Sequence, residues 1–125
     1  MEIPSGQGNS VLAPNILSLI AYLLAPFTGI VVLVLERDNK EVQFHAWQAM
    51  LFGGGYIALV IALEIVSALL GAIASFLGVM IGLLIPLVMI TAFVVWLCCL
   101  AKAYRGERWK IPYLGDVAAR RAGLE

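Results

Sequence analysis

The chain has 125 residues, of which 62% are hydrophobic and 13% are charged, and its formal net charge at pH 7 is zero. A typical soluble domain has about 25% charged residues, and a fold of this size could not remove so much apolar surface from water. The composition, with a mean hydropathy of +0.99, excludes an ordinary soluble domain and predicts one compact membrane domain. We expect lipid and other membrane protein subunits as partners, and no nucleic acid.

The N-terminal segment, residues 1–13, begins with ten mostly polar residues and contains no Lys or Arg. It lacks the basic region with which a secretory signal peptide begins, so no cleavage is expected. We expect a short flexible tail.

The first apolar run covers residues 14–35 and carries no charged side chain. A helix needs about 20 apolar residues to cross a hydrocarbon core about 30 Å thick, so this run predicts a first membrane span. Pro26 lacks the N–H that would bond the carbonyl of Tyr22, which predicts a kink near the middle of the span. A neighbouring helix or hydroxyl must then satisfy that carbonyl.

Residues 36–41 are the charged interruption between two long apolar runs. Asp38, followed three residues later by Glu41, is typical of a helix start. Asp38 would be the N-cap, and the Glu41 carboxylate would reach back to the backbone N–H of that residue. The second helix is therefore expected to begin near residue 39, outside the lipid. Its first turns place Trp47 in the headgroup region, where indole rings are favoured.

Residues 46–101 contain one charged side chain, that of Glu64. A continuous helix of that length would extend about 84 Å, nearly three bilayers, so the chain must reverse direction. The cluster of Gly and Ser at 71–78 is the best turn. This predicts a second span at about 44–70 and a third at about 76–103.

The sequence as a whole therefore predicts an all-α membrane protein with three transmembrane helices over residues 14–104. The first and third helices are expected to be kinked at Pro26 and Pro86. A short interfacial segment follows at the C-terminal end.

That segment, residues 105–125, is basic and interleaves aromatic with charged side chains, with a short helix expected at 117–122 capped by Asp116. We expect this tail to pack against the 36–41 loop as one surface. Ion pairs between the loop acids and Arg105, Arg108 and Lys110 would contribute little. The main contribution is expected from apolar cover of the bundle end by Trp109, Ile111 and Tyr113.

The basic residues are distributed asymmetrically. All eight lie in the loop and the tail: Arg37, Lys40, Lys102, Arg105, Arg108, Lys110, Arg120 and Arg121. Basic residues favour the cytoplasmic side of a membrane. We therefore expect a three-span protein of the cell membrane, with its N-terminus outside and its C-terminus in the cytoplasm.

Glu64 is the first candidate functional residue, because a carboxylate within a span costs about 2.5–3.5 kcal/mol on insertion scales. In a three-span bundle, Tyr22 and Ser18 lie at a similar depth and could donate to it. One interpretation is a proton or cation relay. The other is a polar tether between helices, or a glutamate that extends towards the interface.

His45, Gln48, Tyr56 and Ser67 fall within about 100° on one face of the second helix and are expected to point into the bundle. His45 could ligate a metal, haem or chlorophyll, but such a site usually needs further ligands. A hydrogen-bonding role is the alternative, and no cofactor or metal is predicted.

Gly78 and Gly82 form a GxxxG pattern, which favours close helix packing, here within the bundle more than between copies. The adjacent Cys98 and Cys99 are expected to be small apolar residues. The sequence contains no recognisable catalytic set, so no enzyme activity is predicted.

Three motifs carry a family resemblance: AYLLAPFTG at 21–29, FHAWQ at 44–48, and KAYRGERWKIP at 102–112 followed by Gly115 and Asp116. Together they resemble a family of small uncharacterised bacterial and archaeal multi-pass membrane proteins, often described as similar to the inner-envelope import component of chloroplasts. The resemblance implies a membrane protein near a translocation or assembly machine.

The leading functional hypothesis is a non-enzymatic scaffold or accessory subunit of a membrane complex that docks through its loop and tail. A second is a small channel or transporter built around Glu64, as a homo-oligomer. A third is a cofactor-bearing accessory subunit of an electron-transfer or photosynthetic complex that uses His45.

Overall fold

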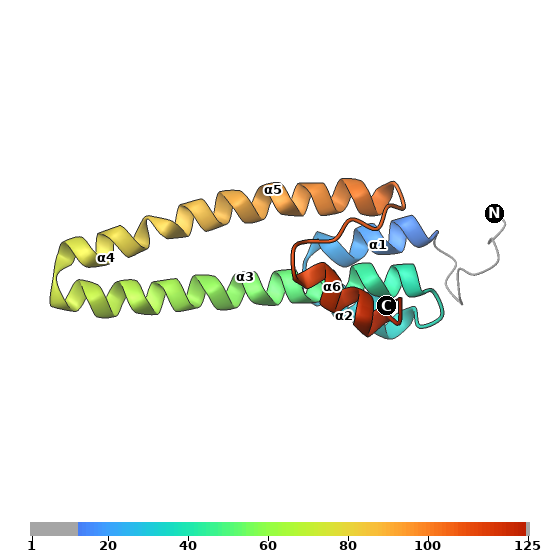
Figure 1. The fold of residues 1–125 in the computed structure, drawn as a ribbon, viewed down its shortest axis with the longest axis horizontal. Helices are drawn as coiled ribbons and strands as arrows, with labels where there is room; N and C mark the ends of the chain where they lie inside the picture. The colour runs from blue at the N-terminus through green and yellow to red at the C-terminus, as the bar shows by residue number, and fades with distance from the viewer. Residues whose placement is uncertain (1–12, 125) are drawn as a thin grey trace. The chain divides into compact units, whose positions relative to one another are not determined.

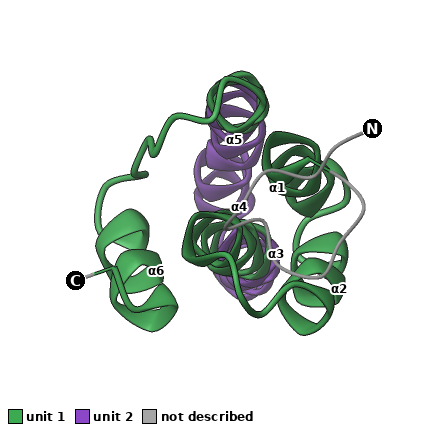
Figure 2. Cartoon of the chain, turned by 90° about the vertical axis from the view of Figure 1, so that its right-hand side faces the viewer, with its two compact units in different colours: residues 1–54, 96–125 green, residues 55–95 purple. Residues whose placement is uncertain are grey.

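The computed structural model describes residues 13–124, which form six α-helices and no β-strand (Figure 1). The all-α prediction is therefore confirmed. The helices are α1 (Pro14–Leu23), α2 (Phe27–Leu35), α3 (Lys40–Ile73), α4 (Ser75–Gly82), α5 (Leu84–Tyr104) and α6 (Leu114–Ala122). The chain divides into two compact units, called unit 1 (residues 1–54 and 96–125) and unit 2 (residues 55–95) (Figure 2). The expected tail at 1–13 lies outside the described residues except for Ala13.

The first apolar run forms a helical hairpin instead of the single predicted span. Helices α1 and α2 lie side by side, and the chain reverses direction between them (Figures 1 and 2). The turn at Pro26 lies against Gly53, whereas Asn15, at the start of α1, donates to the carbonyl of Tyr104 at 3.0 Å. Ten residues extend only about 15 Å, half of a hydrocarbon core about 30 Å thick. The structure therefore does not confirm the prediction of one span over 14–35.

The backbone groups near Pro26 that lack a helical partner are satisfied by other parts of the chain, which stabilises the hairpin. The carbonyl of Tyr22 accepts a hydrogen bond from the indole N–H of Trp96 at 2.6 Å, so a neighbouring helix supplies the missing donor. The hydroxyl of Thr28 donates to the carbonyl of Ala21 at 3.0 Å and accepts from the N–H of Leu24 at 3.1 Å. The prediction that a neighbouring helix or hydroxyl satisfies the freed groups is confirmed.

Two helical segments of the described chain are long and apolar enough to cross a membrane: Lys40–Ile73 and Ser75–Tyr104. The turn between them is at Ala74, inside the range expected from the Gly and Ser cluster. The second segment is interrupted at Leu83, three residues before Pro86, where a kink was predicted. These two candidate spans do not confirm the predicted three.

The N-cap of α3 is Asn39 and not Asp38. The Asn39 Oδ1 accepts from the N–H groups of Glu41 at 3.0 Å and Val42 at 3.3 Å. This satisfies two of the N–H groups that a helix start leaves without a partner. The capping side chain thus lies one residue later than the sequence pattern indicated.

Unit 1 contains the buried core of the described chain, built around the first part of α3. Within unit 1, α3 lies between α6 and the α1–α2 hairpin (Figure 2). The buried α3 residues are Val42, Phe44, His45, Ala46, Gln48, Ala49 and Gly53. Close approach of α2 depends on Gly29, where an added Cβ would lie 3.0 Å from the carbonyl oxygen of Ala46.

Unit 2 is built differently, because its helices touch through small residues. An added Cβ on Gly78 would lie 2.7 Å from the Cα of Gly71, so the backbones of α3 and α4 are in contact there. The hydroxyl of Ser67 donates to the carbonyl of Gly78 at 2.8 Å, and Gly82 faces the same hydroxyl. This glycine contact within the chain agrees with the expected packing role of Gly78 and Gly82.

Candidate functional site

A buried polar cluster, formed by Tyr22, His45 and Gln48, lies inside unit 1. The hydroxyl of Tyr22 is 3.0 Å from His45 Nδ1, and Gln48 Nε2 donates to the same hydroxyl at 2.8 Å. All three side chains are at most 3% exposed. When the Tyr22 O–H donates to His45, the three groups form one directed chain of hydrogen bonds.

Gln48 also connects this cluster to the C-terminal tail. Its Nε2 donates to the carbonyl of Trp109 at 3.0 Å, and its Oε1 accepts from the N–H of Ile111 at 2.8 Å. Both donors of the amide group and one acceptor site are therefore used. A single buried side chain thus holds α1, α3 and the segment after α5 together.

The His45 ring is enclosed by aromatic neighbours. Its centroid lies 5.6 Å from that of Tyr22 and 5.0 Å from that of Phe44, both in edge-on arrangements. With Nδ1 in contact with the Tyr22 hydroxyl, the ring acts as a hydrogen-bonding group of the core. Among residues 13–124 no group of three or more His, Cys, Asp or Glu side chains could hold a metal ion.

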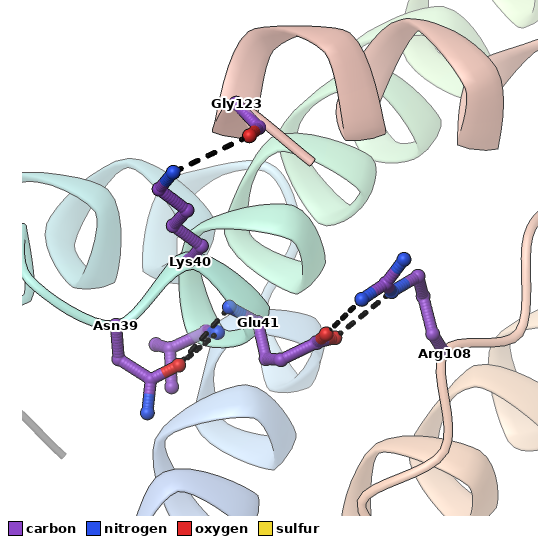
Figure 3. Close-up of polar contacts among 6 residues, drawn as sticks. Asn39, Lys40, Glu41, Arg108 and Gly123 are labelled. Atoms are coloured by element: carbon purple, nitrogen blue, oxygen red, sulfur yellow. Dashed lines mark hydrogen bonds and ion pairs between the residues drawn. The ribbon is translucent and has the colours of Figure 1, made fainter. Parts of the chain in front are cut away.

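The second feature of unit 1 is a polar surface, called the loop–tail surface, which joins residues 36–41 to residues 105–124. Arg108 Nε donates to Glu41 Oε2 at 3.1 Å, and its Nη2 pairs with the other carboxylate oxygen (Figure 3). Lys40 Nζ donates to the carbonyl of Gly123 at 3.4 Å (Figure 3). The predicted packing of loop against tail is therefore confirmed.

Apolar contacts beneath this surface come from α6, which covers the start of α3. Phe44 packs with Ala118, Ala119 and Ala122, and Trp47, Leu51 and Leu124 pack against this group. The guanidinium of Arg121 lies 5.9 Å from the centre of the Trp47 ring. Three small residues on one face of α6 let it approach α3 closely.

Two details of the tail prediction are wrong. Tyr113 is 87% exposed and covers nothing, whereas Ile111 is 8% exposed and belongs to the core. Helix α6 begins at Leu114, so Asp116 lies in its first turn and is not its N-cap. Asp116 instead pairs with Lys110 at 3.3 Å.

The end of α5 carries a further ion pair on the same side of unit 1. Lys102 Nζ lies 2.9 Å from Glu107 Oε2. The hydrogen bond from Lys102 and its positive charge hold the pKa of Glu107 below its usual range. The Glu107 carboxylate therefore stays ionised to a lower pH than an ordinary glutamate does.

Sequence reasoning missed one buried group, Glu36. Its side chain is 1% exposed, and its Oε1 accepts from the N–H of Asp38 at 3.3 Å. Within residues 13–124 the other oxygen, Oε2, has no hydrogen-bond partner. No sequence pattern indicates this burial, because Glu36 resembles any charged residue that ends an apolar run.

The remaining candidate residues do not gather into one site. Glu64 is exposed in unit 2, whereas Tyr22 and Ser18 are buried in unit 1, where Tyr22 bonds His45 and Gln48. A role for Glu64 as relay, channel residue or tether stays a prediction.

The expected polar face of the second helix is likewise divided between the units. His45 and Gln48 belong to the buried cluster, but Tyr56 is half-buried in unit 2 and Ser67 bonds the carbonyl of Gly78. Of the two cysteines, Cys99 is buried and Cys98 is exposed, and both are free thiols.

Comparison with known proteins places the chain among membrane proteins. Residues 10–118 match the model of the magnetosome magnetite crystal formation protein family. A UPF0132 membrane protein of Archaeoglobus fulgidus is 38% identical over 109 residues, covering 87% of this chain and 95% of the relative. A UPF0132 membrane protein of Methanocaldococcus jannaschii is 35% identical over 113 residues, covering 90% and 92%.

No solved structure matches the chain. The relatives confirm a family of small archaeal and bacterial membrane proteins, while the likeness to the chloroplast import component stays a prediction. The chain therefore belongs to the magnetosome magnetite crystal formation protein family, and the UPF0132 membrane proteins are its relatives.

Proposed function

We propose that this chain is a non-enzymatic membrane protein that serves as a scaffold or accessory subunit and docks partners through the loop–tail surface. The observation that carries the proposal is the way this surface is fixed. Gln48 holds the tail backbone from within, and the Glu41–Arg108 pair joins tail to loop from outside. A surface held in one conformation loses less entropy when a partner binds than a flexible tail would.

The α1–α2 hairpin leads us to propose a different membrane topology from the one expected from the sequence. All eight basic residues belong to unit 1 and none to unit 2, so the positive-inside rule favours a cytoplasmic loop–tail surface. Since the hairpin returns to its starting side, the start of α1 would also lie on the cytoplasmic side. We therefore propose two spans with both ends in the cytoplasm, in place of an external N-terminus.

Reporter fusions test this topology. Reporters at the N-terminus, after Ala74 and at the C-terminus should give inside, outside and inside. A three-span chain would give outside, outside and inside, so the N-terminal reporter alone decides between the two. An inside signal at Ala74 would contradict both.

The docking role is tested by purification in mild detergent with identification of bound proteins. Arg105→Glu and Arg120→Glu together reverse two exposed charges of the loop–tail surface. Leu69→Ala, at a 64% exposed position in unit 2, is the control. Partners lost from the charge-reversed protein and kept by the control support the proposal. Equal loss from both, or no partner at all, contradicts it.

The resemblance to the chloroplast import component supports a place for such a scaffold beside a translocation or assembly machine. The matching family's description refers instead to magnetite crystal formation, a property stated of that family. Both descriptions are compatible with a membrane-bound organising role. The proteins identified by co-purification would distinguish them.

A further inference from the structure

Glu36 follows α2 directly and places a carboxyl group inside unit 1. Its side chain is 1% exposed, so the group is removed from water. Its Oε1 accepts from the N–H of Asp38 at 3.3 Å, whereas Oε2 has no hydrogen-bond partner within residues 13–124. Buried carboxylates normally have both oxygens satisfied and their charge paired. The unsatisfied oxygen therefore points to a ligand from outside the described residues.

The described residues do not supply a positive charge for this carboxylate. Arg37, the next residue, donates its Nε to the carbonyl of Val34 at 3.3 Å instead. Protonation of Glu36 would not satisfy the group either, because a protonated Oε2 would be a buried donor that lacks an acceptor. Among residues 13–124 no ion pair includes Glu36, since the pairs there join Lys102 to Glu107, Arg108 to Glu41, and Lys110 to Asp116.

The place of Glu36 in the fold makes a cation favourable on a second ground. Glu36 is the C-cap of α2, and no basic side chain lies in the last turn of that helix. The C-terminal end of a helix carries a partial negative charge and carbonyl groups that lack helical partners. Helix C-terminal ends and backbone carbonyls coordinate Na⁺ in membrane transporters. The helix end and the buried carboxylate therefore favour the same kind of ligand.

The chemistry of these donors favours an alkali cation over other metals. No three His, Cys, Asp or Glu side chains of residues 13–124 gather where they could hold a metal ion. Thiolate and imidazole ligands select the softer metals, whereas carboxylate and carbonyl oxygens suit hard cations. A single buried negative charge is balanced by one positive charge, and a divalent ion would leave a buried charge without a counterpart.

We propose that the C-terminal end of α2 binds one monovalent cation, Na⁺ or K⁺, with Glu36 Oε2 as the charged ligand. The cation would connect the end of the hairpin to the 36–41 loop, because Oε1 of the same carboxylate already holds the backbone of Asp38. The inference does not rest on the docking proposal or on the membrane topology. It concerns a buried group of unit 1 alone.

The test compares salts at constant ionic strength, with thermal unfolding of the full-length protein in detergent followed by circular dichroism. Choline chloride is replaced stepwise by NaCl or KCl, so that screening stays the same while the ligand increases. A cation that binds only the folded protein raises the unfolding midpoint, by about 5 °C at about ten times its dissociation constant. The rise should saturate with at least one of the two ions.

Two results of this salt series would overturn the proposal. Identical midpoints in NaCl, KCl and choline chloride would mean that a water molecule satisfies Oε2. A rise with CaCl₂ at matched ionic strength, but with neither alkali salt, would mean that the site is not one for a monovalent ion.

Two matched variants then assign the effect to Glu36. Glu36→Gln removes the negative charge but keeps an oxygen that can accept from the N–H of Asp38, so the fold should persist. Asp38→Asn makes the same change of charge at an exposed position of the same loop. The response to Na⁺ or K⁺ should disappear in Glu36→Gln and remain in Asp38→Asn. A response that Glu36→Gln keeps, or that both variants lose, would contradict the assignment.

Equilibrium dialysis gives a second readout that does not depend on unfolding. Radioactive Na⁺, or Rb⁺ in place of K⁺, is dialysed against the folded protein at the concentrations that saturate the salt series. The wild-type protein and Asp38→Asn should each hold one cation per chain, and Glu36→Gln should hold none. If the wild-type protein retained no cation, or if Glu36→Gln retained as much as Asp38→Asn, Glu36 would not be a cation ligand.

Discussion

Units 1 and 2 are stabilised by different means, although both consist of helices with few charges. Within residues 13–124, every large buried hydrophobic side chain belongs to unit 1, as do the buried polar residues Ser18, Glu36, His45 and Gln48. Unit 2 exposes most of its large apolar side chains and joins its helices through the Gly71–Gly78 contact and Ser67. Unit 1 has its own core, whereas unit 2 depends on lipid as its apolar surroundings.

Apolar helices can thus be stabilised either by packing against other parts of the chain, as in unit 1, or by surrounding lipid, as in unit 2. In unit 1 the α1–α2 hairpin and the tail with α6 pack around the first part of α3, so its buried polar groups must be satisfied internally (Figure 2). In unit 2 the lipid-facing surface needs no complement beyond apolar side chains. Substitutions should therefore destabilise the protein more in unit 1 than in unit 2, and the measured losses test this difference between the units.

The largest effect is expected at Gly53, where an added Cβ would lie 2.4 Å from the backbone nitrogen of Pro26. Gly53→Ala should destabilise the protein by about 3 kcal/mol, because backbone atoms at the hairpin turn must move. Gly54→Ala is the matched control, since nothing lies within 4 Å of its added Cβ. Denaturant unfolding in detergent, followed by tryptophan emission, measures both. Equal stability of the two variants would mean that the hairpin is not packed on α3.

A somewhat smaller loss is expected for Gln48→Leu. The carbonyl of Trp109 and the N–H of Ile111 lose their buried partner, at a cost of about 2 kcal/mol. The tail should also become sensitive to limited proteolysis. Gln43→Leu is the control, because Gln43 bonds the exposed carbonyl of Arg37 at 2.8 Å and not the tail. If the tail of Gln48→Leu stayed protected from protease, the Gln48 amide would not be what holds the tail in place.

Unit 2 provides the contrasting polar deletion. Ser67→Ala removes the 2.8 Å bond to the carbonyl of Gly78 and should cost about 0.6 kcal/mol, the average for such bonds between membrane helices. The stability lost in Ser67→Ala should therefore be clearly smaller than that lost in Gln48→Leu, as the difference between the two units predicts. If the serine variant were as unstable as the glutamine variant, unit 2 would have a polar core of its own.

The smallest effect is expected at the exposed ion pair of the loop–tail surface. Glu41→Gln should destabilise the protein by about 0.5 kcal/mol at low salt and by less at high salt, because water and ions screen exposed charges. Arg108→Gln should have the same effect, and the double variant should be no worse than either single variant. A large additive loss would mean that the two residues do not act as a pair.

The sequence predicted the parts of this fold that depend on local pattern. The charged interruption, the reversal near Ala74 and the break near Pro86 all follow from residue types that end or start helices. The inward position of His45 and Gln48 followed from helical periodicity, and the unsatisfied carbonyl of Tyr22 followed from Pro26. Each of these inferences depends only on residues that are close together in the sequence.

The hairpin could not be predicted in this way. A run of 22 uncharged, mostly apolar residues is long enough to cross the membrane, so length alone favoured a span. What decides otherwise is complementarity with distant residues: Gly53 makes room for the turn, and Trp96 supplies the donor for Tyr22. The same limit applies to the polar cluster, because the partners of Gln48 in the tail are backbone groups that no side-chain motif announces.

The bonds from Gln48 to the tail also impose an order on how the protein is made. Their partners, Trp109 and Ile111, follow Gln48 by 61 and 63 residues, close to the end of the chain. At a synthesis rate of about 5–20 residues per second, the ribosome needs several seconds to deliver them after Gln48. Throughout that interval the amide of Gln48 lacks its final partners, and both candidate spans are completed before those partners are made. Closure of the unit 1 core is therefore a late, post-insertion event, and a nascent chain truncated before residue 109 would enter the membrane without it.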